Sequence, residues 1–172
     1  VIHLKNPFDT HFYSAAYGNR VQLSNWFEEL SAGEFYFNTV TRELSVFPPA
    51  GSSMTPTNTP VVVPALVEVM TLTGVPSAAL PYVENLHFTG FSVQHSAVET
   101  EPCFSGTCSA QSAAFLTTAT VHATWTRQCS FSNLKIAHTG GYGMWLEDGT
   151  TGNVVTQSVF QDLGAGGVRI GL

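Results

Sequence analysis

Three side chains in the second half of the chain could carry acid–base chemistry: His138, Glu147 and Asp162. Glycoside hydrolysis uses two carboxyl groups roughly 5–10 Å apart, one on each side of the scissile bond. Glu147 and Asp162 are candidates for such groups, and His138 is a candidate for transferring a proton. Glu147 also has a purely structural interpretation, because the run Glu-Asp-Gly at 147–149 is typical of a turn. The sequence therefore does not identify the catalytic residues, and these three are the candidates.

Trp145, Arg169 and Tyr142 are the residues best suited to bind a substrate such as a sugar. An exposed tryptophan can stack on a sugar ring, and a neighbouring arginine can pair with a uronic-acid carboxylate. Tyr142 could line the same groove or form a hydrogen bond across a turn. The alternative is that another part of the chain covers Trp145 and that Arg169 is simply solvated.

A repeat in the sequence predicts where the acid–base candidates lie. Three five-residue segments align with one another, and their last residues form the column His95/His138/Asp162. Alternate apolar positions in these segments are predicted to face inward, in the columns Phe91/Leu134/Ser158 and Val93/Ile136/Phe160. The His/His/Asp column could be an acid–base ladder facing a groove. It could equally be a ladder of side chains that cap the backbone of neighbouring turns.

A second set of segments aligns in the same way and contains the binding candidates. Its inward columns are Phe115/Met144/Val168 and Thr117/Leu146/Ile170, and its outward column is Leu116/Trp145/Arg169. The second and third copies are 24 residues apart in both sets. The first and second copies are 43 residues apart in one set and 29 in the other, which predicts a 14-residue insertion between His95 and Ala114.

A constant period with several short strands per repeat predicts an all-β fold, a right-handed parallel β-helix, since each repeat can bury its apolar face only against its neighbours. The coils are expected to occupy residues 83–172. Residues 1–82 are expected to form an N-terminal region that leads into the first coil. Within it, the aromatic runs at 33–38 and 44–49 predict a β-hairpin, and residues 67–74 alternate like a strand.

Several runs resemble a known family. Residues 132–146 and 161–171, with the aromatic runs at 26–30, 33–37 and 44–51, are similar to right-handed parallel β-helix repeat proteins. More narrowly, residues 20–172 resemble the branch of the pectate-lyase-like superfamily that contains glycoside hydrolase family 141. The resemblance implies polysaccharide hydrolysis by acidic residues. Members of that branch are several times longer and their catalytic acids fall in later coils, so none is assigned here, and the chain is expected to be a fragment or a reduced β-helix.

The composition argues against nucleic acid, a membrane span and a metal ion as partners. The net charge is −6, and the six Lys and Arg residues are scattered singly, which argues against nucleic acid, because a phosphate backbone attracts clustered basic side chains. No apolar run approaches the ~20 residues of a membrane span. No metal site is expected, because no second Cys or His pair accompanies Cys103 and Cys108, and no cofactor is predicted.

Two functions follow as expectations. The first is a part of a secreted, carbohydrate-active β-helix protein, with this segment supplying scaffold and glycan contacts. The alternative is a non-catalytic extracellular β-helix that is structural or binds glycans, in a filament or larger assembly. Whether the chain is an enzyme stays open. An uncovered β-helix end exposes apolar interior and unpaired strand edges, so further coils or another chain are expected to cover the C-terminal coil.

Cys103 and Cys108 are predicted to form a disulfide, because they lie five residues apart in a polar insertion, whereas Cys129 lies in an alternating run and is expected to be a buried free thiol. Two reduced surface thiols are the alternative. Peptide mapping of the unreduced protein is expected to recover one peptide pair joined through Cys103 and Cys108. Alkylation of both thiols without prior reduction, or a bridge to Cys129, would contradict the prediction.

Overall fold

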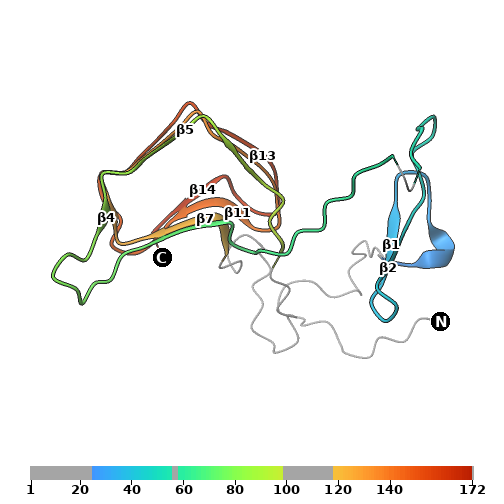
Figure 1. Ribbon diagram of the computed structural model, residues 1–172, viewed down its shortest axis with the longest axis horizontal. Coiled ribbons are helices and arrows are strands. Elements are labelled where there is room, and N and C mark those ends of the chain that lie inside the picture. The colour runs from blue at the N-terminus through green and yellow to red at the C-terminus, as the bar shows by residue number, and fades with distance from the viewer. Residues whose placement is uncertain (1–24, 56–57, 99–117, 172) are drawn as a thin grey trace, which may run out of the picture. The chain divides into compact units, whose positions relative to one another are not determined.

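The computed structural model describes residues 25–55, 58–98 and 118–171, and these residues are all-β apart from one 3-10 turn, η2 (Phe27–Glu29). The chain divides into two compact units, residues 1–61 and residues 62–172 (Figure 1). The disulfide predicted between Cys103 and Cys108 lies outside the described residues. Cys129 is buried and free, which confirms its prediction as a core thiol.

The first unit contains the predicted aromatic hairpin. Strands β1 (Phe35–Asn38) and β2 (Glu43–Val46) pair antiparallel. The Asn25 side chain extends the hairpin, because its amide accepts a hydrogen bond from the Phe37 N–H and donates one to the Phe37 carbonyl. The ring of Phe27, from η2, packs edge-on against Tyr36 at a centroid distance of 5.3 Å. One face of the hairpin is apolar and exposed, formed by Phe35, Phe37, Leu44 and Val46.

The second unit consists of successive passes of the chain, each of which adds one strand to several sheets. Three sheets have the orders β13-β10-β6, β14-β11-β7-β3 and β12-β9-β5, the fourth is β4-β8, and every pairing is parallel (Figure 1). The strands are β3 (Met70–Thr73), β4 (Val83–Glu84), β5 (His87–Thr89), β6 (Ser92–Gln94), β7 (Ala119–Thr124), β8 (Thr126–Arg127), β9 (Ser130–Ser132), β10 (Lys135–Thr139), β11 (Tyr142–Leu146), β12 (Val154–Thr156), β13 (Val159–Leu163) and β14 (Val168–Ile170).

The chain turns between these strands at residues with positive φ. Three such residues recur five positions apart in each of three passes, namely Asn85, Gly90 and His95, then Gln128, Asn133 and His138, then Gly152, Gln157 and Asp162. Residues other than glycine rarely adopt positive φ, although Asn, Asp and His do so more often than most. Because the spacing is the same in each pass, the corners lie in register and the strands between them can pair along their length.

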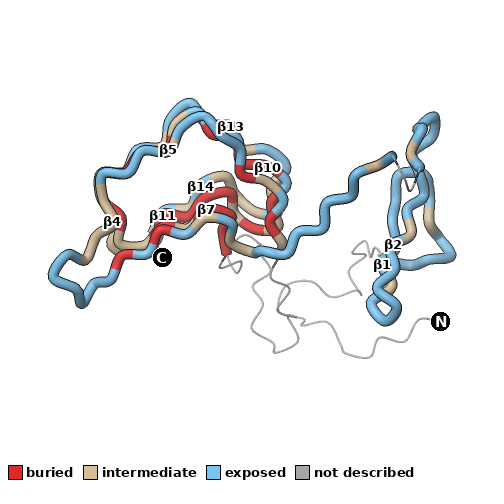
Figure 2. The backbone as a smooth tube through the Cα atoms, viewed as in Figure 1, coloured by how far each residue is buried: buried red, intermediate tan, exposed pale blue. Residues whose placement is uncertain are grey.

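Alternate side chains of the strands meet in an internal core. Figure 2 marks the buried residues of β7, β10 and β11 in red. The register places Val93, Ile136 and Phe160 in one column, as predicted, and Ile136 is fully buried. It also pairs Met144 with Val168 and Leu146 with Ile170, which confirms the 24-residue repeat between β11 and β14. Stacked neighbours therefore complete each layer of the core.

The predicted alignment of residues 114–117 with 143–146 is wrong. Strand β7 takes that place, and Val121 and Ala123 are the partners of Met144 and Leu146. The repeat here is 23 residues rather than 29, so the stretch between β6 and β7 contains 20 extra residues rather than 14. Both alignments put apolar side chains inside, because a shift of six residues preserves the alternation of a strand. Phe115 and Leu116 lie outside the described residues.

Three residues predicted to face inward are exposed: Phe91 (39%), Val168 (40%) and Ile170 (76%). Val168 and Ile170 lie in the predicted columns, but β14 is at the edge of its sheet and pairs only with β11. Met144 and Leu146, one pass earlier in the same columns, are buried because they have a neighbour on both sides. At the β14 edge these two columns therefore leave their side chains exposed, whereas Leu72 in β3 and Val93 in β6 are buried at the opposite edges of their sheets.

Two isoleucines give a test of this packing. Ile136→Ala is expected to lower the free energy of unfolding by about 2–5 kcal/mol, because it opens a cavity in a fully buried layer. Ile170→Ala should lower it by no more than about 0.5 kcal/mol, because most of that side chain is already in water. Denaturant unfolding of the two variants provides the measurement, and equal losses would contradict the assigned layers.

Candidate functional site

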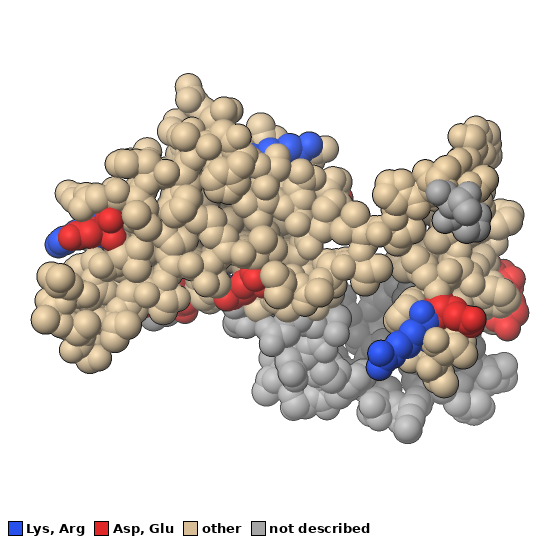
Figure 3. Space-filling view, in the orientation of Figure 1, with Lys and Arg blue, Asp and Glu red and all other residues tan. Residues whose placement is uncertain are grey.

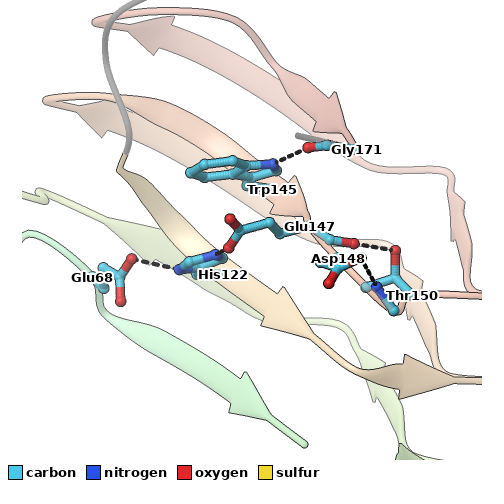
Figure 4. Close-up of polar contacts among 8 residues, drawn as sticks. Glu68, His122, Trp145, Glu147, Asp148, Thr150 and Gly171 are labelled. Atoms are coloured by element: carbon cyan, nitrogen blue, oxygen red, sulfur yellow. Dashed lines mark hydrogen bonds and ion pairs between the residues drawn. The ribbon is translucent and has the colours of Figure 1, made fainter. Parts of the chain in front are cut away.

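A histidine between two glutamates lies on the outer face of the sheet β14-β11-β7-β3 (Figure 4). His122 Nδ1 is 2.6 Å from Glu68 Oε1, and His122 Nε2 is 2.7 Å from Glu147 Oε2. All three side chains are partly exposed. The two contacts engage both nitrogens of the imidazole ring, one with each carboxylate group. Two short, charge-assisted hydrogen bonds thus tie together the segment before β3, strand β7 and the end of β11.

The alternation of β7 explains why His122 faces outward. Its neighbours Val121 and Ala123 point into the core, so the side chain between them must point away from it. The parallel register then puts His122 beside Thr71 on one side and Trp145 on the other. On the outer face of the sheet, Thr71, His122 and Trp145 therefore form a ladder of side chains across neighbouring strands. Glu68 and Glu147 lie on either side of His122.

Trp145 is held inside this ladder and is only 5% exposed. Its ring stacks on His122 at a centroid distance of 5.0 Å with a 9° angle between the planes. Arg169 Cζ lies 4.1 Å from the centroid of the Trp145 ring. The indole N–H donates a hydrogen bond of 2.7 Å to the Gly171 carbonyl. Trp145 is therefore covered, as in the alternative interpretation, and it offers no open face to a sugar, because its neighbours in the ladder occupy both faces of the ring.

Arg169 also contacts Tyr142, the third residue predicted to bind a substrate. Its Cζ lies 5.5 Å from the centroid of the Tyr142 ring, in addition to its contact with Trp145. The guanidinium of Arg169 thus lies against the rings of both Trp145 and Tyr142. Their predicted positions on neighbouring strands lead to this grouping.

Glu147 lies in the turn predicted for it, and its side chain contacts His122. Its carbonyl accepts a hydrogen bond from the Thr150 hydroxyl, and the Gly149 N–H contacts Asp148 Oδ1 in a turn where Gly149 has φ of 69°. Its carboxylate meanwhile binds His122. The backbone forms the turn that Glu-Asp-Gly predicts, and the side chain is free to join the cluster on the sheet.

A second cluster lies near the end of β10 and at the corresponding positions of the adjacent passes. The rings of His95 and His138 stack at a centroid distance of 5.0 Å, and His138 Nδ1 is 2.6 Å from Asp162 Oδ2. This geometry confirms the predicted His/His/Asp column. Glu147 and Asp162 belong to different clusters, and each of them is paired with a histidine.

Glu68 and His122 were not among the site residues predicted from the sequence. Glu68 precedes β3 and lies 54 residues from its partner, so no local spacing connects them. The alternating pattern around His122 was a usable signal, since it predicts an outward side chain. Only the register of β7 places that side chain beside Trp145, and the sequence alignment put residues 114–117 in this position instead.

The described residues contain no group of three or more His, Cys, Asp or Glu side chains that could hold a metal ion. Among these residues, no helix has the length and apolar character needed to cross a membrane. On the face shown in Figure 3, charged side chains occur in small separate groups on a largely uncharged surface. Within the described parts of the chain, the two His–carboxylate clusters are therefore the main candidates for a functional site.

No protein-family model, curated protein or solved structure matches this chain.

The burial of Trp145 can be tested by hydrogen exchange of its indole N–H. We expect this proton to exchange slowly, because it is buried and bonded to the Gly171 carbonyl. Trp26, which is 48% exposed, provides the internal comparison and should exchange fast. The two signals can be followed by NMR and assigned with Trp145→Phe and Trp26→Phe variants. Exchange of Trp145 as fast as that of Trp26 would show that the ladder is open.

Proposed function

We propose that this chain forms coils of a right-handed parallel β-helix in a secreted, carbohydrate-active protein, and that it supplies scaffold and glycan contacts. The parallel, in-register pairing of strands 23–24 residues apart supports the β-helix, because one pass per repeat is what stacked coils require. The repeated corners support it as well, since they return the chain to the same path in each pass.

The Glu68–His122–Glu147 cluster is the observation that carries the glycan proposal. Partly exposed carboxylates are strong acceptors for sugar hydroxyl groups, and one imidazole ring with two hydrogen bonds of 2.6 and 2.7 Å separates them. The rigid sheet beneath the cluster keeps these groups in place.

The alternative is a non-catalytic, structural or glycan-binding β-helix protein. It is favoured by a specific observation: each candidate acid already has a partner within the chain. Glu147 is bound to His122 and Asp162 to His138. A carboxylate that must attack or protonate a substrate has to leave such a partner or share it. Binding without turnover is therefore the simpler use of these clusters.

The exposed edge formed by β12, β13 and β14 supports a further part of the proposal. These strands are last in their sheets, and Val168 and Ile170 are exposed in columns that are buried one pass earlier. Unpaired strand edges beside apolar side chains favour pairing with more strands. We infer that further β-helix coils or another chain cover this edge.

Affinity measurements on a panel of plant and algal polysaccharides test the glycan proposal. We expect the 172-residue chain to bind at least one of them without releasing reducing ends. The double variant Glu68→Gln/Glu147→Gln should weaken binding about tenfold, because it removes two charged acceptors. Glu28→Gln, at an exposed position in the first unit, is the matched control and should bind like the parent.

Two results would change this conclusion. A failure to bind any polysaccharide in the panel would refute the glycan contacts. Hydrolysis that is lost in Glu147→Gln or in Asp162→Asn would instead establish the chain as an enzyme and exclude the non-catalytic alternative.

A further inference from the structure

A shallow, open groove of about 430 Å³ lies beside the His138–Asp162 pair. Its apolar walls come from Pro64, Val98 and Leu163, and its polar side comes from His138 and Asp162. These residues belong to passes that are distant in the sequence but adjacent in the fold. The groove is separate from the Glu68–His122–Glu147 cluster, because none of those three residues lines it.

The polar side of the groove is open to a ligand. The side chain of His138 is 42% exposed and that of Asp162 is 70% exposed. Asp162 binds Nδ1 of the imidazole, which leaves Nε2 as the nitrogen that faces other partners. The stacked ring of His95 limits how far His138 can turn. His138 is thus an oriented hydrogen-bonding group, and its Nε2 has no hydrogen-bond partner among the described residues.

The backbone keeps this arrangement rigid. His95, His138 and Asp162 have φ of 61°, 53° and 53°, so their side chains project from equivalent corners of successive passes. The turns after these corners are packed backbone to backbone. A Cβ added at Gly164 would lie 2.2 Å from the Gly140 carbonyl oxygen, so glycine is required there. A rigid, partly apolar groove with few oriented polar groups is typical of a binding site for a small ligand.

The lining also indicates the charge of the ligand. Among the described residues, the lining contains one carboxylate and one histidine, and no lysine or arginine. An acidic sugar would be repelled by Asp162 and would find no permanent cation to compensate. A neutral sugar would place its C–H face on Pro64, Val98 and Leu163 and its hydroxyl groups on the polar side.

We propose that this groove binds a neutral sugar ring, with His138 and Asp162 contacting its hydroxyl groups. The inference rests on the proposed glycan function and adds a second site with a defined ligand class. It differs from the sequence-based interpretation, in which Trp145 and Arg169 would select an acidic sugar.

Binding of neutral xylo-, cello- and manno-oligosaccharides, compared with oligogalacturonate, tests the proposal. We expect at least one neutral oligosaccharide to bind and to shift the imidazole NMR signals of His138. His138→Asn and Asp162→Asn should each raise its Kd about tenfold. Asparagine is chosen because it tolerates positive φ, so the corner can keep its shape. His87→Asn is the control, at an exposed histidine that does not line the groove, and its Kd should match the parent.

The outcomes separate this inference from the function it rests on. An unchanged Kd in both corner variants, or preferential binding of oligogalacturonate, would overturn the groove assignment. If binding is instead lost only in Glu68→Gln/Glu147→Gln, the glycan function stands and the second site does not. If no oligosaccharide or polysaccharide binds, both proposals fail.

Discussion

The register of the positive-φ corners is the constraint on which the rest of the second unit depends. Strands pair along their length only if each pass turns at the same places, and the corners recur five residues apart in three successive passes. Positive φ is unfavourable for side chains such as His and Gln, by about 1 kcal/mol or more at each position. The corners persist because the paired strands and the packed core on either side of them offset that cost.

Because the corners of successive passes are in register, side chains at equivalent positions stack on one another. Neighbouring strands in a sheet lie about 4.8 Å apart, so residues at equivalent positions can stack ring on ring. His122 on Trp145 and His95 on His138 both have centroid distances of 5.0 Å, and Phe88 on Phe131 has 5.3 Å. The same spacing builds the core inside and the polar clusters outside. Both clusters are thus direct consequences of the fold, and each needs only a carboxylate in reach of a stacked histidine.

The two clusters differ in how they meet solvent, and this decides what each can do. His122 uses both ring nitrogens within the chain and lies on a flat sheet face, where two carboxylates are the accessible groups. His138 uses one nitrogen and lies beside a groove with apolar walls. The first arrangement ties strands together and presents acceptors, whereas the second offers shape as well as polarity. A ligand that needs both a hydrophobic contact and hydrogen bonds fits the second better.

Local patterns in the sequence were sufficient for the hairpin, the strand character, the buried Cys129 and the His95/His138/Asp162 column. These features depend on alternation and on a constant repeat, which neighbouring residues express. The register of β7 was not accessible in this way, because shifting a strand by an even number of residues leaves the same side chains facing inward. The sequence allowed both an open and a covered Trp145, and its neighbours 23 and 24 residues away decide between them. Glu68 joins His122 across 54 residues of chain, and only the stacking of whole passes brings the two together.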